Sequence, residues 1–201
     1  MMGILKSRLP TSVLINGVEY TIRSNFRTMI RLEELLQDPD VDEQDRVWLA
    51  LRLFYHEIPE NMEKAVEQLL WFYRCDKQEN LYQKKARKRK VKRTDRIYDF
   101  QYDDDYIYAA FMSQYHLDLH EVEYLHWWKF RAMFNSLNDD TQFVKIMEYR
   151  AVELDKVPKE KRAFYKRMKQ LYALPLSQSE EERQNALEQA LLNGQSLEGL
   201  V

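Results

Sequence analysis

Three histidines, His116, His120 and His126, lie close together in the chain with acidic residues between them. Imidazole and carboxylate groups are common zinc ligands, so this spacing raises a metal site as a hypothesis. His120 and His126 are six residues apart, however, which on a helix rotates one side chain about 600° from the other and makes the two diverge. Residue 124 is Tyr, where an HExxH motif beginning at His120 needs its second histidine. We therefore expect no metal site.

Two other features have side chains that can do chemistry. Paired carboxylates act as general acid and base when their surroundings separate their pKa values, and Asp103, Asp104 and Asp105 are consecutive. Three acidic residues at the start of a helix are more typical of solvated capping residues that favour the helix dipole. The single cysteine, Cys75, follows an apolar helical stripe, where a thiol usually packs rather than reacts. We expect no catalytic residue.

The distribution of glycine narrows the possible functions further. There is no glycine between Gly17 and Gly194. Phosphate-binding loops, dinucleotide-binding turns and nucleophile elbows need glycine, because it adopts positive φ freely and lets a ligand approach the backbone. The middle of the chain therefore has none of these motifs, and we expect no cofactor and no enzymatic activity.

The elements that position these residues are mainly helical. Asn16-Gly17 between two short β-type runs predicts a hairpin over residues 9–24, because this pair is preferred in a type I′ turn. Apolar periodicity then predicts a helix over 26–37, capped by Asn25 or Ser24 and ended by Pro39. Further helices are predicted from near Asp42, at about 61–75, from near Asp103, after Asp118, after Asp140, after Pro158 and over 179–193. The fold class is mainly α: a single multi-helix domain, 1–201, with about seven or eight helices and a short N-terminal β-hairpin.

Residues 77–96 break the helical pattern. They hold ten Lys or Arg against two acidic residues, so this segment carries +8 and the rest of the chain −10. A segment with one charge sign and few apolar residues predicts a flexible, disordered basic loop or linker. Its densest part can contact phosphates, but it lacks an adjacent docking helix or aromatic platform, so we favour a solvated loop over nucleic-acid binding. The basic-loop residues are Lys84, Lys85, Arg87, Lys88, Arg89, Lys90, Lys92 and Arg93.

The half of the chain over 98–193 is rich in aromatic residues. Twelve aromatics lie within 98–134, and the helix expected after Asp118 has two adjacent apolar stripes. Two stripes exceed the arc that a surface helix usually buries, so that helix is either central to the core or covered by a partner. Aromatic side chains are enriched at the centres of protein interfaces. The candidate partner-binding residues are Tyr106, Tyr108, Trp127, Trp128 and Phe130.

Several short motifs together resemble a known family. These are LPTSV at 9–13, ING at 15–17, YIYAAF at 106–111, LHWWKF at 125–130 and LYALP at 171–175. With these motifs the chain resembles the bacteriophage gene-product-fifteen family, tail-module proteins of long-tailed phages and prophages, over about Leu9 to Leu200. The resemblance implies a tail assembly chaperone that acts on the tape measure protein, alone or with a companion chaperone. The family has no established catalytic residues.

Two alternatives to a chaperone stay open. One is a structural component retained in the tail, and the other is a nucleic-acid-binding protein that works through Lys84–Arg93. No apolar run approaches the ~20 residues that cross a bilayer, and the first residues lack the apolar core of a signal peptide. With the resemblance, this implies a protein of the host cytoplasm that need not remain in the mature virion.

Overall fold

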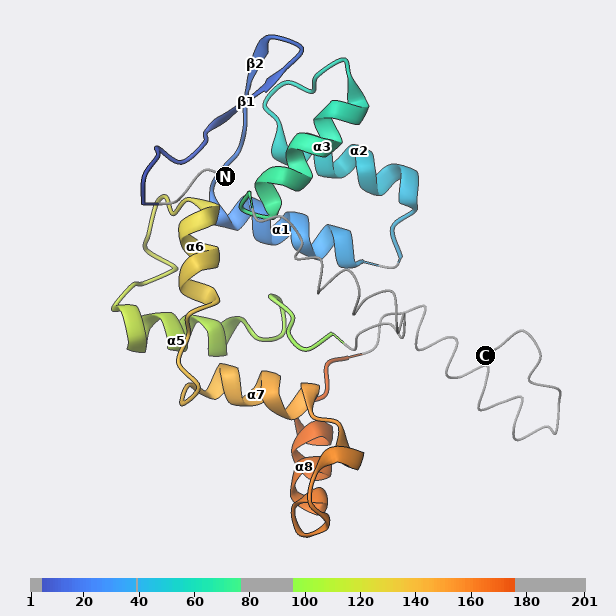
Figure 1. The fold of residues 1–201 in the computed structure, drawn as a ribbon, viewed down its shortest axis with the longest axis vertical. Coiled ribbons are helices and arrows are strands. Elements are labelled where there is room, and N and C mark those ends of the chain that lie inside the picture. The colour runs from blue at the N-terminus through green and yellow to red at the C-terminus, as the bar shows by residue number, and fades with distance from the viewer. Residues whose placement is uncertain (1–4, 39, 77–95, 176–201) are drawn as a thin grey trace, which may run out of the picture.

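The computed structural model describes residues 5–38, 40–76 and 96–175. Within these ranges the chain is mainly α with a short N-terminal hairpin, as the sequence predicts, and it has seven α-helices (Figure 1). The elements are β1 (Ser12–Ile15), β2 (Val18–Thr21), α1 (Phe26–Gln37), α2 (Glu43–Phe54), α3 (Met62–Tyr73), α5 (Asp104–Tyr115), α6 (Trp127–Phe134), α7 (Gln142–Ala151), the 3₁₀ turn η1 (Leu154–Lys156) and α8 (Lys159–Leu171).

The predicted hairpin is confirmed, with β1 and β2 antiparallel and Ser12 opposite Thr21. Asn16 and Gly17 form its turn with φ of 53° and 84°, the positive values that a type I′ turn requires. Alternation along β1 buries Val13 and Ile15 against the core and leaves Leu14 exposed to solvent. The hairpin thus covers one side of the helical body.

Local capping residues set the starts of the first three helices. Asn25, Asp42 and Asn61 each accept a hydrogen bond from a backbone N–H of the first turn of α1, α2 and α3, respectively. Such caps satisfy donors that have no partner within the helix. The predicted bounds of α1 are confirmed at both ends. The apolar side chains of Val47 in α2 and Met62 in α3 are exposed.

The prediction of a helix that begins after Asp118 is wrong, because α6 begins only at Trp127. Asp118 caps only a turn, in which its carboxylate accepts hydrogen bonds from the backbone N–H groups of His120 and Glu121. Arg27 of α1 donates to three backbone carbonyls of this segment, those of Leu119, His120 and Val122, and ties the segment to α1. A contact with α1, far away in sequence, overrides local helix propensity here.

Aromatic rings form the centre of the core, and Phe130 of α6 is the ring with the most neighbours. Its centroid lies 5.0 Å from that of Phe26, 5.2 Å from Phe111, 5.7 Å from Trp127 and 5.8 Å from Phe134. These rings come from α1, α5 and α6, so their packing joins the first helices to the second half of the chain. Such aromatic pairs stabilise a core beyond the area that they bury.

The two adjacent tryptophans of α6 also donate hydrogen bonds to backbone carbonyls at the C-terminal end of α3. The indole N–H of Trp127 donates to the carbonyl of Tyr73 at 3.0 Å, and that of Trp128 donates to the carbonyl of Phe72 at 2.8 Å. Carbonyls in the last turn of a helix have no partner within the helix. The tryptophan pair therefore fastens α6 to α3 while both rings stay buried.

Asp103 differs from the expectation of a solvated capping residue. It is the N-cap residue of α5 but its side chain makes no capping hydrogen bond. Its carboxylate is fully buried and pairs with Arg150 of α7 through two contacts of 2.6 and 2.9 Å. The Arg150 guanidinium also donates to the carbonyls of Ile97 and Tyr172. This buried bidentate pair fixes α5 to α7. The two carbonyl contacts of Arg150 also connect α7 to the chain before α5 and after α8.

Helix α8 projects from the end of the molecule beyond α7 (Figure 1). The sequence predicts an apolar stripe of Phe164, Met168 and Leu171 after Pro158, and α8 has that amphipathic pattern. None of its residues is buried, and Phe164 and Leu171 are 51% and 65% exposed. The stripe is therefore only partly covered by the described residues.

Candidate partner-binding site

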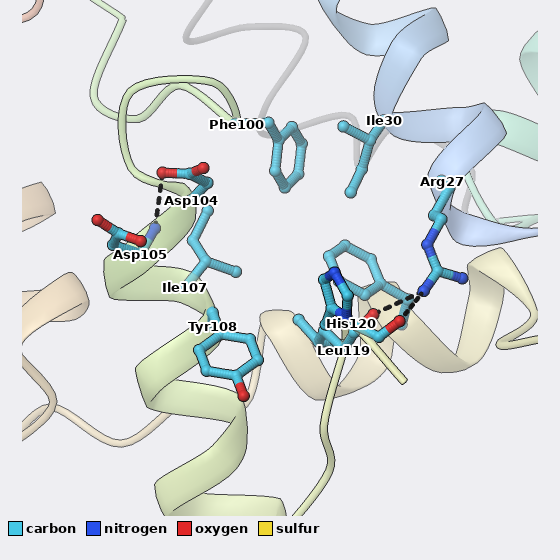
Figure 2. Close-up of a pocket in the computed structure, with 10 residues that line it drawn as sticks. Arg27, Ile30, Phe100, Asp104, Asp105, Ile107, Tyr108, Leu119 and His120 are labelled. Atoms are coloured by element: carbon cyan, nitrogen blue, oxygen red, sulfur yellow. Dashed lines mark hydrogen bonds between the residues drawn. The ribbon is translucent and has the colours of Figure 1, made fainter. Parts of the chain in front are cut away.

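An open cavity of about 600 Å³ lies between α1, α5 and the loop that precedes α6. We call it the α1–α5 groove, and Figure 2 shows the side chains that line it. Its lining residues are Arg27, Ile30, Phe100, Asp104, Asp105, Ile107, Tyr108, Leu119, His120 and Phe130. Each of the three sides comes from a different part of the chain, and the fold alone brings them together.

The floor of the groove is apolar. Ile30 of α1 and Ile107 of α5 face each other across it, with Phe100 above and Leu119 below in the view of Figure 2. The ring of Phe130 also lines the groove and belongs to the core stack already described. An apolar concave floor with a few polar groups at its edge is typical of a binding site.

The rim of the groove is mainly acidic. Asp104 and Asp105 lie at the start of α5, both exposed. Next to the groove, Asp118 accepts a hydrogen bond from the hydroxyl of the lining residue Tyr108 at 3.2 Å, and Glu121 lies nearby. Arg27 is the basic side chain of the rim, and it is turned to the carbonyls of Leu119, His120 and Val122 at 2.7–3.0 Å. Carboxylates therefore lie along the α5 edge of the opening.

Local electrostatics keep both members of the Tyr108–Asp118 pair in their usual forms at neutral pH. Desolvation, the hydrogen bond to Asp118 and the charge of Asp118 raise the pKa of Tyr108. Partial desolvation favours a higher pKa for Asp118, but backbone donors from His120 and Glu121 outweigh it and lower that pKa. The rim thus presents a phenol and a stable carboxylate, which suits recognition rather than proton transfer.

The structure divides the five predicted partner-binding residues into two groups. Trp127, Trp128 and Phe130 are buried in the core of the described chain, with 0–3% of their surface exposed, and of these three only Phe130 also lines the groove. The aromatic side chains of this segment pack in the core, and its two indole N–H groups donate hydrogen bonds to backbone carbonyls of α3. Tyr106 and Tyr108 are 36% and 37% exposed. Tyr108 lines the groove, whereas Tyr106 points away and its ring contacts Tyr172 after α8.

The three clustered histidines are separated by the fold. His116 ends α5 in the left-handed conformation, and His120 lies exposed beside Glu121. His126 is buried; its Nδ1 accepts from the N–H of Trp128 and its Nε2 donates to the carbonyl of Pro10, both at 3.0 Å. Among the described residues no group of three His, Cys, Asp or Glu side chains is placed to hold a metal ion.

The role of His126 as the N-cap of α6 predicts a pH-dependent stability. Burial lowers its pKa below the usual 6.5, and Nδ1 can cap α6 only while it is unprotonated. The unfolded chain therefore binds a proton near pH 6.5 that the folded chain does not, so stability falls as pH drops below that value. We expect urea unfolding to show a larger loss of stability from pH 7.5 to 5.5 for the wild type than for His126→Asn, which keeps a capping side chain. Equal losses in the two proteins would rule this role out.

The basic-loop residues Lys84 to Arg93 lie outside the described residues, whereas the chain on both sides of 77–95 lies within them. Tyr98 donates to the buried carboxylate of Glu33 at 2.5 Å, and Tyr73 at the end of α3 interacts with the same carboxylate. Burial and the Glu33 charge raise the pKa of Tyr98 to about 12. Arg131 of α6 lies 3.7 Å from Glu33 and balances its charge. Both stems of the segment therefore meet at one buried ionic cluster.

The comparisons with known proteins give one match. The family model described as Bacteriophage Gp15 protein matches residues 5–174. The chain belongs to this family. Membership identifies a bacteriophage structural or assembly protein and confirms the resemblance found in the sequence. No curated protein and no solved structure matches the chain.

Two further points concern this Gp15 family member: whether a described helix could cross a membrane, and whether the sequence could have predicted the groove. No described helix is both long and apolar enough to cross a bilayer. The groove itself was not visible in the sequence, because Ile30, Leu119 and Arg27 have no local pattern that marks them as a site. Of the candidate partner-binding residues, Tyr108 and Phe130 line the groove, and Asp104, Asp105 and His120 were considered only for catalysis or metal binding.

Proposed function

We propose that this protein is a phage tail assembly chaperone whose α1–α5 groove binds amphipathic helices of the tape measure protein. The observation that carries the proposal is an open groove with an apolar floor in a member of a phage structural or assembly family. A tape measure protein is a very long helical chain with apolar stripes that must stay soluble until the tail tube forms around it. A groove of this kind holds one helical turn after another through apolar anchors at i, i+3 or i+4 and i+7.

The chemistry of the rim supports a peptide partner and not a small metabolite. Asp104 and Asp105 border an apolar floor, and Asp118 lies beside Tyr108 of the same helix. Carboxylates at this edge favour helices that carry Lys or Arg beside their apolar stripe. The protein would act in the host cytoplasm and dissociate as the tube assembles, alone or with a companion chaperone.

Tyr108 and Tyr106 form a matched pair that tests the groove directly. Both lie on α5 with nearly equal exposure, but only Tyr108 lines the groove. We expect Tyr108→Ala to weaken binding of the tape measure protein from the same phage genome about fivefold or more, because an anchoring tyrosine contributes about 1 kcal/mol or more. Tyr106→Ala should bind like the wild type. Co-expression followed by pull-down and titration with purified tape measure fragments measures both.

Two results would contradict the proposal. One is failure of the wild-type protein to bind the tape measure protein or to keep it soluble. The other is a loss of binding in Tyr106→Ala without a loss in Tyr108→Ala, which would place the partner on the opposite side of α5. Mass spectrometry of purified particles separates a chaperone, which would be absent, from a structural tail component, which would be present.

A further inference from the structure

Helix α8 has an apolar face that the described residues cover only in part: the ring of Phe164 lies 6.1 Å from that of Tyr149 of α7, but Phe164 and Leu171 stay 51% and 65% exposed. Phe164 and Leu171 are seven residues apart, so they lie two turns apart on the same side of the helix. On another side of the helix, Arg162 and Lys169 donate to the backbone carbonyls of Val157 and Val152. An exposed apolar stripe on a projecting helix is a mark of an interaction surface.

The charge of α8 is opposite to that of the groove rim. Lys159–Leu171 has six Lys or Arg and one Glu, a net charge of +5 in a chain whose total is −2. The groove has an apolar floor with Asp104 and Asp105 at its α5 edge, and Asp118 lies beside it, bonded to Tyr108. A basic amphipathic helix and an acidic-rimmed apolar groove are complementary in both polarity and charge.

The groove of the same molecule is out of reach for α8. Tyr108 marks the groove side of α5, whereas Tyr106 marks the opposite side, where its ring meets Tyr172 at the end of α8. Helix α5 therefore stands between α8 and the groove, and Figure 1 shows α8 pointing away from α1. Only a second molecule can bring the two surfaces together.

From these observations we infer that the protein self-associates head to tail, with α8 of one copy seated in the α1–α5 groove of the next. Phe164 and Leu171 enter the apolar floor, and the cations of α8 lie beside the carboxylates of the rim. The inference rests on the groove assigned under the proposed function, and it adds that a second copy covers the groove until a tape measure helix displaces it. Because the contact uses two different surfaces, it produces closed rings or open chains.

Sedimentation velocity of the full chain over a range of concentrations tests the inference. We expect the wild type to form species larger than a monomer, and Leu171→Glu to remain monomeric at the same concentrations. Leu14→Glu is the matched control, because Leu14 of the hairpin is 66% exposed and Leu171 is 65% exposed. It should associate like the wild type. Raising the salt concentration should weaken association, since charge pairs at a solvent-exposed rim are screened.

Mixing two deficient variants gives the decisive result. Leu171→Glu keeps an intact groove, and the double variant Asp104→Lys, Asp105→Lys keeps an intact α8, so each alone should be monomeric. A mixture should form one-to-one dimers and nothing larger. If the double variant does not fold, as judged by circular dichroism, Tyr108→Ala takes its place. A wild type that stays monomeric, a Leu171→Glu protein that associates, or a mixture without dimers would overturn the inference.

The same variants distinguish this inference from the proposed function. Leu171→Glu should still bind the tape measure protein, because its groove is unchanged, whereas Tyr108→Ala should lose both interactions. Self-association without any tape measure binding would contradict the proposed function alone. Tape measure binding by a monomeric wild type would contradict self-association alone.

Discussion

Replacing Asp103 by alanine is expected to lower the free energy of unfolding by about 3–5 kcal/mol, the cost of leaving a buried charge without its partner. The Arg150 guanidinium, whose side chain is 8% exposed, would lose both carboxylate contacts and remain in the interior. The backbone N–H of Asp99 would also lose its acceptor. Urea unfolding followed by circular dichroism measures the change.

The exposed pair of Glu153 and Lys156 is the control for this prediction. Its side chains are 58% and 71% exposed at an N–O distance of 2.8 Å, so Glu153→Ala should change stability by less than about 1 kcal/mol. The double variant Asp103→Leu, Arg150→Met removes both buried charges and should recover most of the stability lost in Asp103→Ala. If Asp103→Ala were no more damaging than Glu153→Ala, the pair would not hold α5 to α7.

The second large effect is expected at the centre of the aromatic core. Phe130→Ala should destabilise the protein by about 3–5 kcal/mol, because it removes a fully buried ring that stacks on Phe26, Phe111 and Trp127. Thermal or urea unfolding gives the stability, and near-ultraviolet circular dichroism reports the loss of fixed ring packing.

Trp48→Ala serves as the reference, since Trp48 is 47% exposed on α2 and its loss should cost far less. This comparison also separates core from interface. A Phe130→Ala protein that kept full stability but failed to bind a partner would mean that the ring belongs to a binding surface, contrary to its burial.

The sequence predicted best where the deciding residues are neighbours in the chain. The bounds of α1 follow from Asn25, which caps it, and from Pro39, which prevents its extension. The hairpin follows from Asn16-Gly17, a pair that adopts positive φ at low cost. These predictions needed no knowledge of tertiary structure.

Prediction from the sequence failed where contacts between residues far apart in the chain determine the local structure. The loop before α6 is held by Arg27 of α1, and the buried pair of Asp103 and Arg150 joins residues 47 apart. The aromatic run of α6 was read as either core or interface, and the packing of Phe130 and the two tryptophans settles it as core. The groove depends on three segments that only the fold brings together. Periodicity also found the apolar stripe of α8 but could not say that Phe164 and Leu171 stay uncovered.

The meeting of Tyr73 and Tyr98 at Glu33 makes the intervening segment a natural place to lengthen the protein. Tyr73 and Tyr98 meet at one buried cluster, so the described residues on either side of 77–95 are held near each other. Closing a longer loop across fixed ends costs only about 0.6 kcal/mol for each doubling of its length. A fluorescent protein or an affinity tag grafted there would leave both the groove and α8 unaltered, which provides a handle for following the protein during infection.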